Sequence, residues 1–246
     1  MILLKNFAAP ILVFAVTILS SDKNDEFDKI SRILDKQDSV INAIQLMQRS
    51  VIYSGKTSSI NNLKCYRKGT KFRLETEIAD QSNGVDQRII INNGREMWQI
   101  SKGIKRKLDK KEQSYILAMY KKRLWEFLPE KKKITHLDSL TIIEGYPDKT
   151  STNLTLIKMT IGNDLKRVLS YSFRIGNDIY EVLNRDWNDV FPQIVLPLKI
   201  NVIKNGSLFV ETTLSGIVIN GQLKDTLFDD TRYKDIDIEK VIKEMF

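Results

Sequence analysis

Residues 88–98 read Arg-Ile-Ile-Ile-Asn-Asn-Gly-Arg-Glu-Met-Trp, and this stretch decides the fold class. It begins with an isoleucine run and ends with a second run that carries Trp98, and β-branched and aromatic residues favour strands. Between the runs, Asn92-Asn93-Gly94 supplies residues that tolerate positive φ, as tight hairpin turns require. Strands joined by so short a turn pair antiparallel. The stretch therefore predicts a β-hairpin.

The same pattern of short β-prone runs and tight turns recurs along the chain. Residues 68–70, 176–178 and 204–206 each place Gly in a turn signal. No strand–helix–strand alternation appears, which excludes a parallel sheet of the dinucleotide-binding kind. We predict a mainly β (α+β) protein with a single curved antiparallel sheet. The predicted strands are residues 47–56, 60–67, 71–78, 87–91, 96–101, 104–108, 140–146, 153–161, 167–175, 179–185, 195–204 and 207–220.

Two segments have helical rather than β periodicity. Apolar residues recur at spacings of three, four and seven after a capping Asn24 or Asp25, which predicts an amphipathic helix over residues 25–45. A second apolar stripe predicts a helical insertion over residues 112–128, before a proline. This insertion either covers one face of the sheet or forms a lid over an apolar cavity. Both interpretations place Ile116 and Met119 inside.

The first residues predict export. An apolar run covers residues 7–19, which is shorter than the roughly 20 residues that span a bilayer but within the about 7–15 of a secretory signal. We predict a signal peptide over residues 1–21 and one mature domain over residues 22–246 in the periplasm. An uncleaved anchor is the alternative. No Cys follows the run, so lipidation of a first mature Cys is not expected.

The small number of Cys and His residues excludes several common kinds of site. The chain has one Cys and one His, so it cannot form an intrachain disulfide, a multi-Cys/His zinc site or an iron–sulfur cluster. His136 lies near Asp138 and Ser139, but residues this close in sequence cannot adopt the geometry of a catalytic triad. We expect no enzyme activity, no cofactor and no metal. Cys65 is predicted to be either a buried small hydrophobe or an unpaired reactive thiol.

The order of elements and several short motifs resemble the LolA/LolB-type outer-membrane lipoprotein carriers. Residues 88–98 are similar to that family's apolar strand, Asp/Asn-Gly turn and Trp-bearing strand. Upstream, residues 66–75 match a strand, a turn and a strand that carries Arg or an aromatic residue. Downstream, residues 192–206 and Leu227-Phe228-Asp229 resemble the family's closing hairpin and terminal Phe-containing segment.

This resemblance implies a function. It implies an incomplete (half) β-barrel, covered by the N-terminal helix and a helical lid, whose apolar cavity binds lipoprotein acyl chains or another lipid. The monomeric carrier would receive them from an inner-membrane donor complex and deliver them to an outer-membrane acceptor. A periplasmic lipid sensor that regulates an inner-membrane partner is the alternative function. The implied lipid-binding residues are Phe72, Leu74, Ile90, Trp98, Ile116 and Met119, with Trp98 either a cavity wall or a core plug.

The latch position departs from the family pattern. The best-known carriers place an Arg before a turn Pro to hold the lid shut, whereas this chain has Lys68 before Gly69. Lys is a point charge and lacks the planar fork of Arg, so the multi-donor latch does not carry over directly. Lys68 remains the candidate latch, and Arg67 and Arg73 are possible substitutes.

The net charge of +8 is concentrated in one region. Residues 102–133 contain twelve Lys or Arg and four Asp or Glu, so the remaining 27 basic and 27 acidic residues balance. Such a run is either a solvated face or a surface that docks onto anionic lipid or an acidic partner. Nucleic acid is not expected, because the export signal argues against it. The candidate docking residues are Lys105, Arg106, Lys107, Lys121, Lys122 and Arg123.

Overall fold

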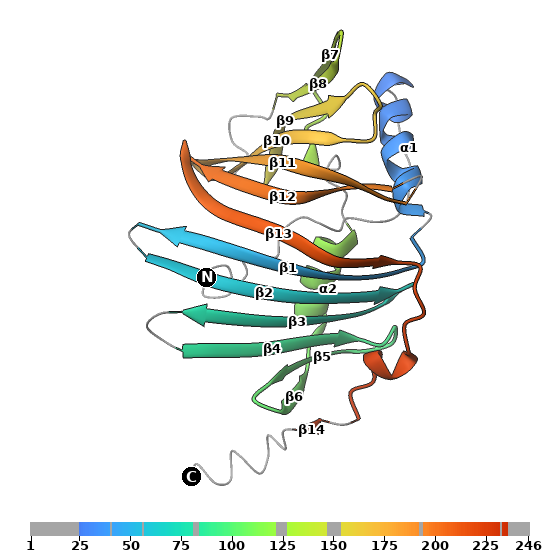
Figure 1. Ribbon diagram of the computed structural model, residues 1–246, viewed down its shortest axis with the longest axis vertical. Coiled ribbons are helices and arrows are strands. Elements are labelled where there is room, and N and C mark those ends of the chain that lie inside the picture. The colour runs from blue at the N-terminus through green and yellow to red at the C-terminus, as the bar shows by residue number, and fades with distance from the viewer. Residues whose placement is uncertain are drawn as a thin grey trace.

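Strands dominate the computed structural model, which describes residues 25–39, 41–55, 57–80, 84–121, 127–146, 154–191, 194–231 and 233–235 (Figure 1). The strands of the first half are β1 (Ala43–Ser54), β2 (Thr57–Lys68), β3 (Lys71–Asp80), β4 (Gly84–Asn92), β5 (Met97–Ser101) and β6 (Ile104–Lys107). Those of the second half are β7 (Lys132–Leu137), β8 (Leu140–Gly145), β9 (Thr155–Gly162), β10 (Val168–Ile175), β11 (Asp178–Phe191), β12 (Ile194–Lys204), β13 (Ser207–Ile219) and β14 (Lys234–Asp235).

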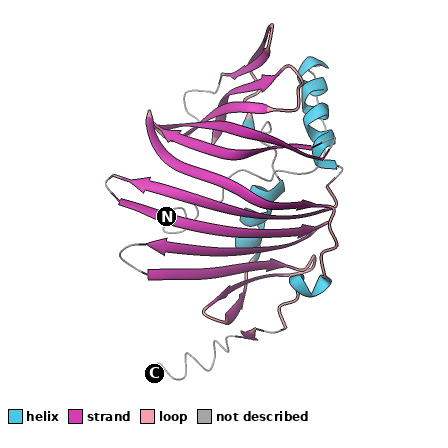
Figure 2. Ribbon diagram, viewed as in Figure 1, coloured by secondary structure: helices cyan, strands magenta, loops and turns pink. Residues whose placement is uncertain are grey.

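These fourteen strands form one sheet, in the order β14-β6-β5-β4-β3-β2-β1-β13-β12-β11-β10-β9-β8-β7. Consecutive strands pair from β1 to β6 and from β7 to β13, and β1 pairs with β13 to join these two meanders. Every pair is antiparallel except the short β14, which pairs parallel to β6. The end strands β14 and β7 do not pair with each other, so the curved sheet stays open (Figure 2). The predicted single antiparallel sheet is confirmed.

The first helix is shorter than predicted. Helix α1 spans Asp25–Ser39, whereas the apolar spacing predicted a helix to residue 45. Residues from Ala43 onward belong instead to β1, because they hydrogen-bond to β2 on one side and to β13 on the other. Ile44 satisfies both the helical spacing and the period of two of a strand, and two flanking strands decide in favour of the sheet.

The insertion between β6 and β7 contains helix α2 (Lys110–Lys121), which begins two residues before the predicted start. Asp109 and Glu112 form a capping box: the Glu112 N–H donates to Asp109 Oδ1 at 2.8 Å, and the Asp109 N–H donates to Glu112 Oε2 at 2.9 Å. The predicted end at residue 128 cannot be compared directly, because residues 122–126 lie outside the described part of the chain.

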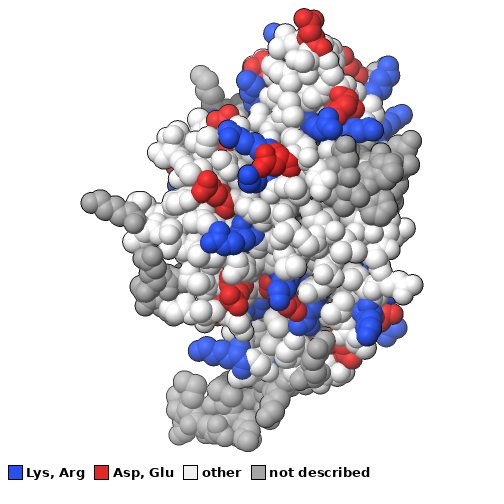
Figure 3. All heavy atoms as spheres, in the orientation of Figure 1, with Lys and Arg blue, Asp and Glu red and all other residues white. Residues whose placement is uncertain are grey.

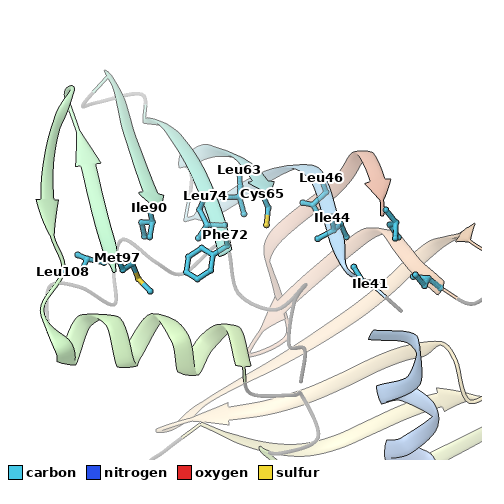
Figure 4. Packing of buried hydrophobic residues seen from close by; sticks show 12 residues of the cluster. Ile41, Ile44, Leu46, Leu63, Cys65, Phe72, Leu74, Ile90, Met97 and Leu108 are labelled. Carbon is cyan, nitrogen blue, oxygen red and sulfur yellow. The ribbon is translucent and has the colours of Figure 1, made fainter. Parts of the chain in front are cut away.

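The face of the sheet toward α2, here called the inner face, carries two apolar clusters. The sheet arches over α2, and the first cluster points from the strands toward this helix (Figure 4). Its buried members are Ile41, Ile44, Leu46, Leu63, Cys65, Phe72, Leu74, Ile90, Met97, Leu108, Ile194 and Ile219. The second cluster lies farther along the sheet, under α1, which contributes Ile30. Its strand members are Ile143, Leu156, Met159, Ile161, Tyr171, Phe173, Val182, Ile200 and Leu214.

A C-terminal segment covers part of the opposite, outer face. It begins with the 3-10 helix η2 (Asp225–Phe228) and ends in β14 beside β6. Tyr233 packs on the outer-face residues Ile91, Trp98 and Ile100, which form a third and separate apolar cluster. The C-terminal end of β4 and most of β5 are therefore buried on both faces.

Candidate functional site

The inner face of β3 to β5 is the candidate binding surface. Phe72 and Leu74 alternate with Arg73 along β3, and Leu74 lies directly opposite Ile90 on β4. Phe72, Leu74 and Ile90 are all buried in the first apolar cluster. This alternation arises because successive side chains of a strand point to opposite faces. The structure therefore brings these three predicted lining residues together on one surface.

Helix α2 covers this surface through its own apolar side chains. Ile116, a predicted lining residue, is half-buried against the first cluster. Leu117 packs beside it, although the sequence analysis did not select Leu117. Met119 belongs to α2, but its side chain lies outside what the structure describes. The described part of the insertion thus covers one face of the sheet, which both sequence interpretations predict.

Trp98 does not belong to the candidate surface. It pairs with Ile91 on β4, whereas the inner-face Ile90 pairs with Gln99. Trp98 consequently points to the outer face, where it is buried with Ile91, Ile100 and Tyr233. The structure corrects the prediction that Trp98 binds lipid together with Phe72, and supports the alternative of a core plug.

The candidate latch residue Lys68 contacts the C-terminal segment. Its Nζ lies 3.2 Å from Asp225 Oδ1 and 3.3 Å from the carbonyl oxygen of Leu223. Lys68, with help from Lys71 at 3.4 Å, lowers the pKa of the Asp225 carboxyl through these hydrogen bonds. The two proposed substitutes also act elsewhere: Arg67 donates to the Ile41 carbonyl oxygen, and Arg73 lies on the outer face.

The contact between α2 and the sheet that most resembles a latch comes instead from Arg106 on β6. Its two terminal nitrogens, Nη1 and Nη2, each lie 2.9 Å from one oxygen of Glu112, in the first turn of α2. The hydrogen bond from Arg106 lowers the pKa of the Glu112 carboxyl, and the backbone bond from Asp109 adds to this effect. A planar guanidinium fork on a carboxylate is the strong, oriented form of an ion pair. Arg106 is one of the candidate docking residues, and its pairing with Glu112 is a finding of the structure.

The other docking residues on β6 are also paired with carboxylates. Lys105 Nζ lies 2.8 Å from Asp230 Oδ2, and both side chains are nearly buried, at 11% and 13% exposure. Lys107 pairs with Glu96. The side chain of Lys121, and the whole of Lys122 and Arg123, lie outside the described residues. The charges of the three candidate docking residues on β6 are thus largely neutralised by carboxylates. Basic and acidic side chains also lie side by side on the face drawn in Figure 3.

Cys65 lies inside the first apolar cluster, beside Leu74 on β3. Burial raises the pKa of its thiol to about 12, against a smaller opposing effect of Arg67. The thiol therefore stays protonated at neutral pH, as expected of a buried small hydrophobe rather than a reactive cysteine.

His136 has a structural role that the sequence analysis did not identify. Its Nδ1 lies 3.0 Å from Thr141 Oγ1 on β8, and its Nε2 contacts Glu26 of α1. The side chain thus joins α1 to the edge hairpin β7–β8. Within the described ranges, no group of three or more His, Cys, Asp or Glu residues is placed to hold a metal ion.

Comparison with solved structures identifies the architecture. The chain resembles a DUF1329 family protein from Desulfovibrio piger, with a TM-score of 0.53, 12% sequence identity, and coverage of 85% of this chain and 98% of that one. It resembles a LolA superfamily protein from Nitrosomonas europaea with a TM-score of 0.50, 12% identity, and coverage of 82% and 97%. This chain has a LolA-like fold.

Another LolA-like structure points the same way. A domain assigned to the outer-membrane lipoprotein-sorting proteins of Vibrio parahaemolyticus matches with a TM-score of 0.51, 12% identity, and coverage of 84% of this chain and 97% of that chain. No protein-family model matches the sequence, and no curated protein matches it either. Among the described helices, none has the length and apolar character needed to cross a bilayer. The similarity of this chain to LolA-like proteins is therefore a similarity of fold.

Proposed function

We propose that this protein is a non-enzymatic carrier of acyl chains, which it binds on the inner face of the half-barrel. The observation that carries the proposal is the apolar surface formed by Phe72, Leu74 and Ile90 under the amphipathic helix α2. Transfer of one methylene group from water to such a surface lowers the free energy by about 0.8 kcal/mol. A carrier needs this affinity together with a cover that opens for release.

The arrangement of α2 suits such a cover. Its first turn is fixed to β6 by Arg106 and Glu112, while Ile116 and Leu117 contact the cluster only through apolar packing. Apolar packing is non-directional, so an acyl chain that replaces these two side chains provides an equivalent contact. We propose that α2 swings about its first turn to admit the chain.

The proposed cellular role follows from the fold and the export signal. The protein acts as a monomer in the periplasm after removal of residues 1–21, and moves lipoprotein acyl chains from an inner-membrane donor to an outer-membrane acceptor. The LolA-like architecture supports this role. Docking onto an anionic membrane involves basic residues of the insertion other than the β6 residues that pair with carboxylates.

Extraction of the native protein tests the proposal. The protein is purified from the envelope of cells that express it, extracted with organic solvent, and the extract is examined by mass spectrometry. Acyl lipid or lipoprotein in stoichiometric amount is the expected result. An empty protein that co-purifies with one inner-membrane partner contradicts the carrier and favours the lipid sensor. A parallel preparation of Leu74→Asn, which places a polar group on the inner face, controls for lipid carried over from the membrane.

A further inference from the structure

A row of polar side chains crosses the inner face between the two apolar clusters. Ser50 on β1 lies directly opposite Asn61 on β2 and directly opposite Thr212 on β13. Gln48 precedes Ser50 on the same face. All four side chains are buried, at 0–6% exposure of each residue, and they lie between the apolar residues of the two clusters.

Three members of this polar row hydrogen-bond to one another. Gln48 Nε2 donates to Ser50 Oγ at 2.9 Å, and the hydroxyl groups of Ser50 and Thr212 lie 2.8 Å apart. Burial of polar groups costs little free energy when they are paired in this way. The hydrogen bonds among these three side chains therefore account for their burial.

Asn61 is the exception. It is 3% exposed, and its Oδ1 atom is fully buried with no hydrogen-bond partner in the structure. An unpaired buried acceptor costs about 1–3 kcal/mol, so native proteins rarely keep one without a use. The carboxamide that carries this oxygen also has two N–H donors, so it can engage a ligand group with both a donor and an acceptor.

The surroundings of Asn61 indicate which ligand presents such a group. Leu63, two residues along the same face, belongs to the first apolar cluster, and Ile200, which lies opposite Thr212, belongs to the second. A ligand at this row therefore has hydrocarbon on either side of one polar linkage. An ester linkage has acceptors only, whereas a secondary amide has an N–H donor for Oδ1 and a carbonyl acceptor for the Asn61 amide.

We infer that the polar row is a recognition site for the linkage of an amide-linked acyl chain, with Asn61 as its specificity-determining residue. This inference rests on the proposed function and adds the class of ligand. The apolar clusters bind the hydrocarbon of any acyl chain, and Asn61 discriminates between linkages by pairing the N–H that an ester lacks. One hydrogen bond made to an otherwise unpaired buried group corresponds to about a tenfold difference in affinity.

Competition binding tests the inference. A fluorescent fatty-acyl probe is bound to the delipidated protein and displaced by palmitoyl N-methylamide or by methyl palmitate, which differ only in the linkage. We expect the amide to displace the probe at about tenfold lower concentration than the ester. In Asn61→Leu this preference disappears while displacement itself persists. Asn62→Leu, the same substitution on the next residue and the opposite face, keeps the preference.

The outcomes separate the inference from the proposed function. If the wild-type protein binds both competitors equally, or if Asn61→Leu keeps the preference, the inference is overturned and the acyl carrier stands. If neither competitor nor the probe binds, both are overturned. Circular dichroism checks that each variant is folded, and Asn61→Ala replaces Asn61→Leu if the larger side chain prevents folding.

Discussion

Arg106 and Glu112 join the sheet to the insertion by two hydrogen bonds of 2.9 Å each, one from each terminal nitrogen of the guanidinium. The same carboxylate accepts the N–H of Asp109, so one side chain both caps α2 and holds its first turn against β6. Among the described side chains of α2, Ile116 and Leu117 pack against the apolar cluster of the inner face. The helix is therefore anchored by polar bonds at one end and by apolar packing beyond it.

Replacement of Arg106 by Gln loosens α2 and also removes the hydrogen bond from Arg106 Nη2 to Gln99 Oε1 on β5. We expect faster hydrogen exchange of the amides of residues 110–121 and a loss of roughly 0.5–1 kcal/mol of stability, as for a partly exposed ion pair. Lys107→Gln is the matched control, because Lys107 pairs with Glu96 and not with α2. Equal exchange in Arg106→Gln and in wild type shows that the ion pair does not hold the helix.

The same ion pair makes the stability of α2 dependent on pH. Because Arg106 lowers the pKa of the Glu112 carboxyl, the stabilisation is fully present above the ordinary value of 4.5 and is lost as pH falls through the lowered value. Urea unfolding of the wild-type protein and of Glu112→Gln measures this stabilisation. The difference between their midpoints is constant near neutral pH and narrows in acid. A difference that stays constant down to pH 3 contradicts the assignment.

Cys65 is expected to resist thiol reagents in the folded protein. With the pKa of its thiol at about 12, the reactive thiolate at pH 8 is about a thousandfold rarer than for an exposed cysteine. Labelling with a maleimide followed by mass spectrometry should show slow modification in buffer and rapid modification in urea. Rapid labelling in buffer means that the cluster around Cys65 and Leu74 opens readily.

The C-terminal segment is held to the outer face by the nearly buried pair of Lys105 and Asp230. Replacement of Asp230 by Ala leaves the Lys105 charge without this carboxylate, and we expect destabilisation by about 2 kcal/mol in urea unfolding. Lys199→Ala is the control, because its pair with Asp186 is more than half exposed on both sides. That control should lose less than about 0.5 kcal/mol. Equal losses in the two variants contradict a structural role for the C-terminal segment.

The hairpin at residues 88–98 shows which features of the fold can be predicted from the sequence and which cannot. Its turn residues predicted β4, β5 and their antiparallel pairing, and the register Asn92↔Met97 confirms them. The sequence does not reveal which face is inner, because Ile89, Ile90 and Ile91 are all apolar. At the C-terminal end of β4 both faces are buried, one under α2 and the other under a segment more than a hundred residues later in the chain.

Other differences have equally local causes. Strand β7 was missed because its residues, Lys-Lys-Ile-Thr-His-Leu, begin with two charges and lack a clear alternation. The pair of Lys105 and Asp230 joins residues 125 positions apart, and no local pattern predicts such a partner. The family resemblance placed Phe72, Leu74 and Ile90 on one face, and the pairing of β3 with β4 shows them together there. Their role in lipid binding stays a prediction.

Binding of an acyl probe to two matched variants tests the central claim most directly. Leu74→Asn places an amide on the inner face, and Ile100→Asn places the same group in the buried outer-face cluster. Because Trp98 lies on the outer face, its own fluorescence is not used as the reporter. Binding is measured instead by the emission of a fluorescent fatty-acyl probe. We predict that Ile100→Asn binds like wild type, and that Leu74→Asn binds at least about tenfold more weakly, because about two methylene groups lose their apolar contacts. Unchanged binding by folded Leu74→Asn contradicts the account.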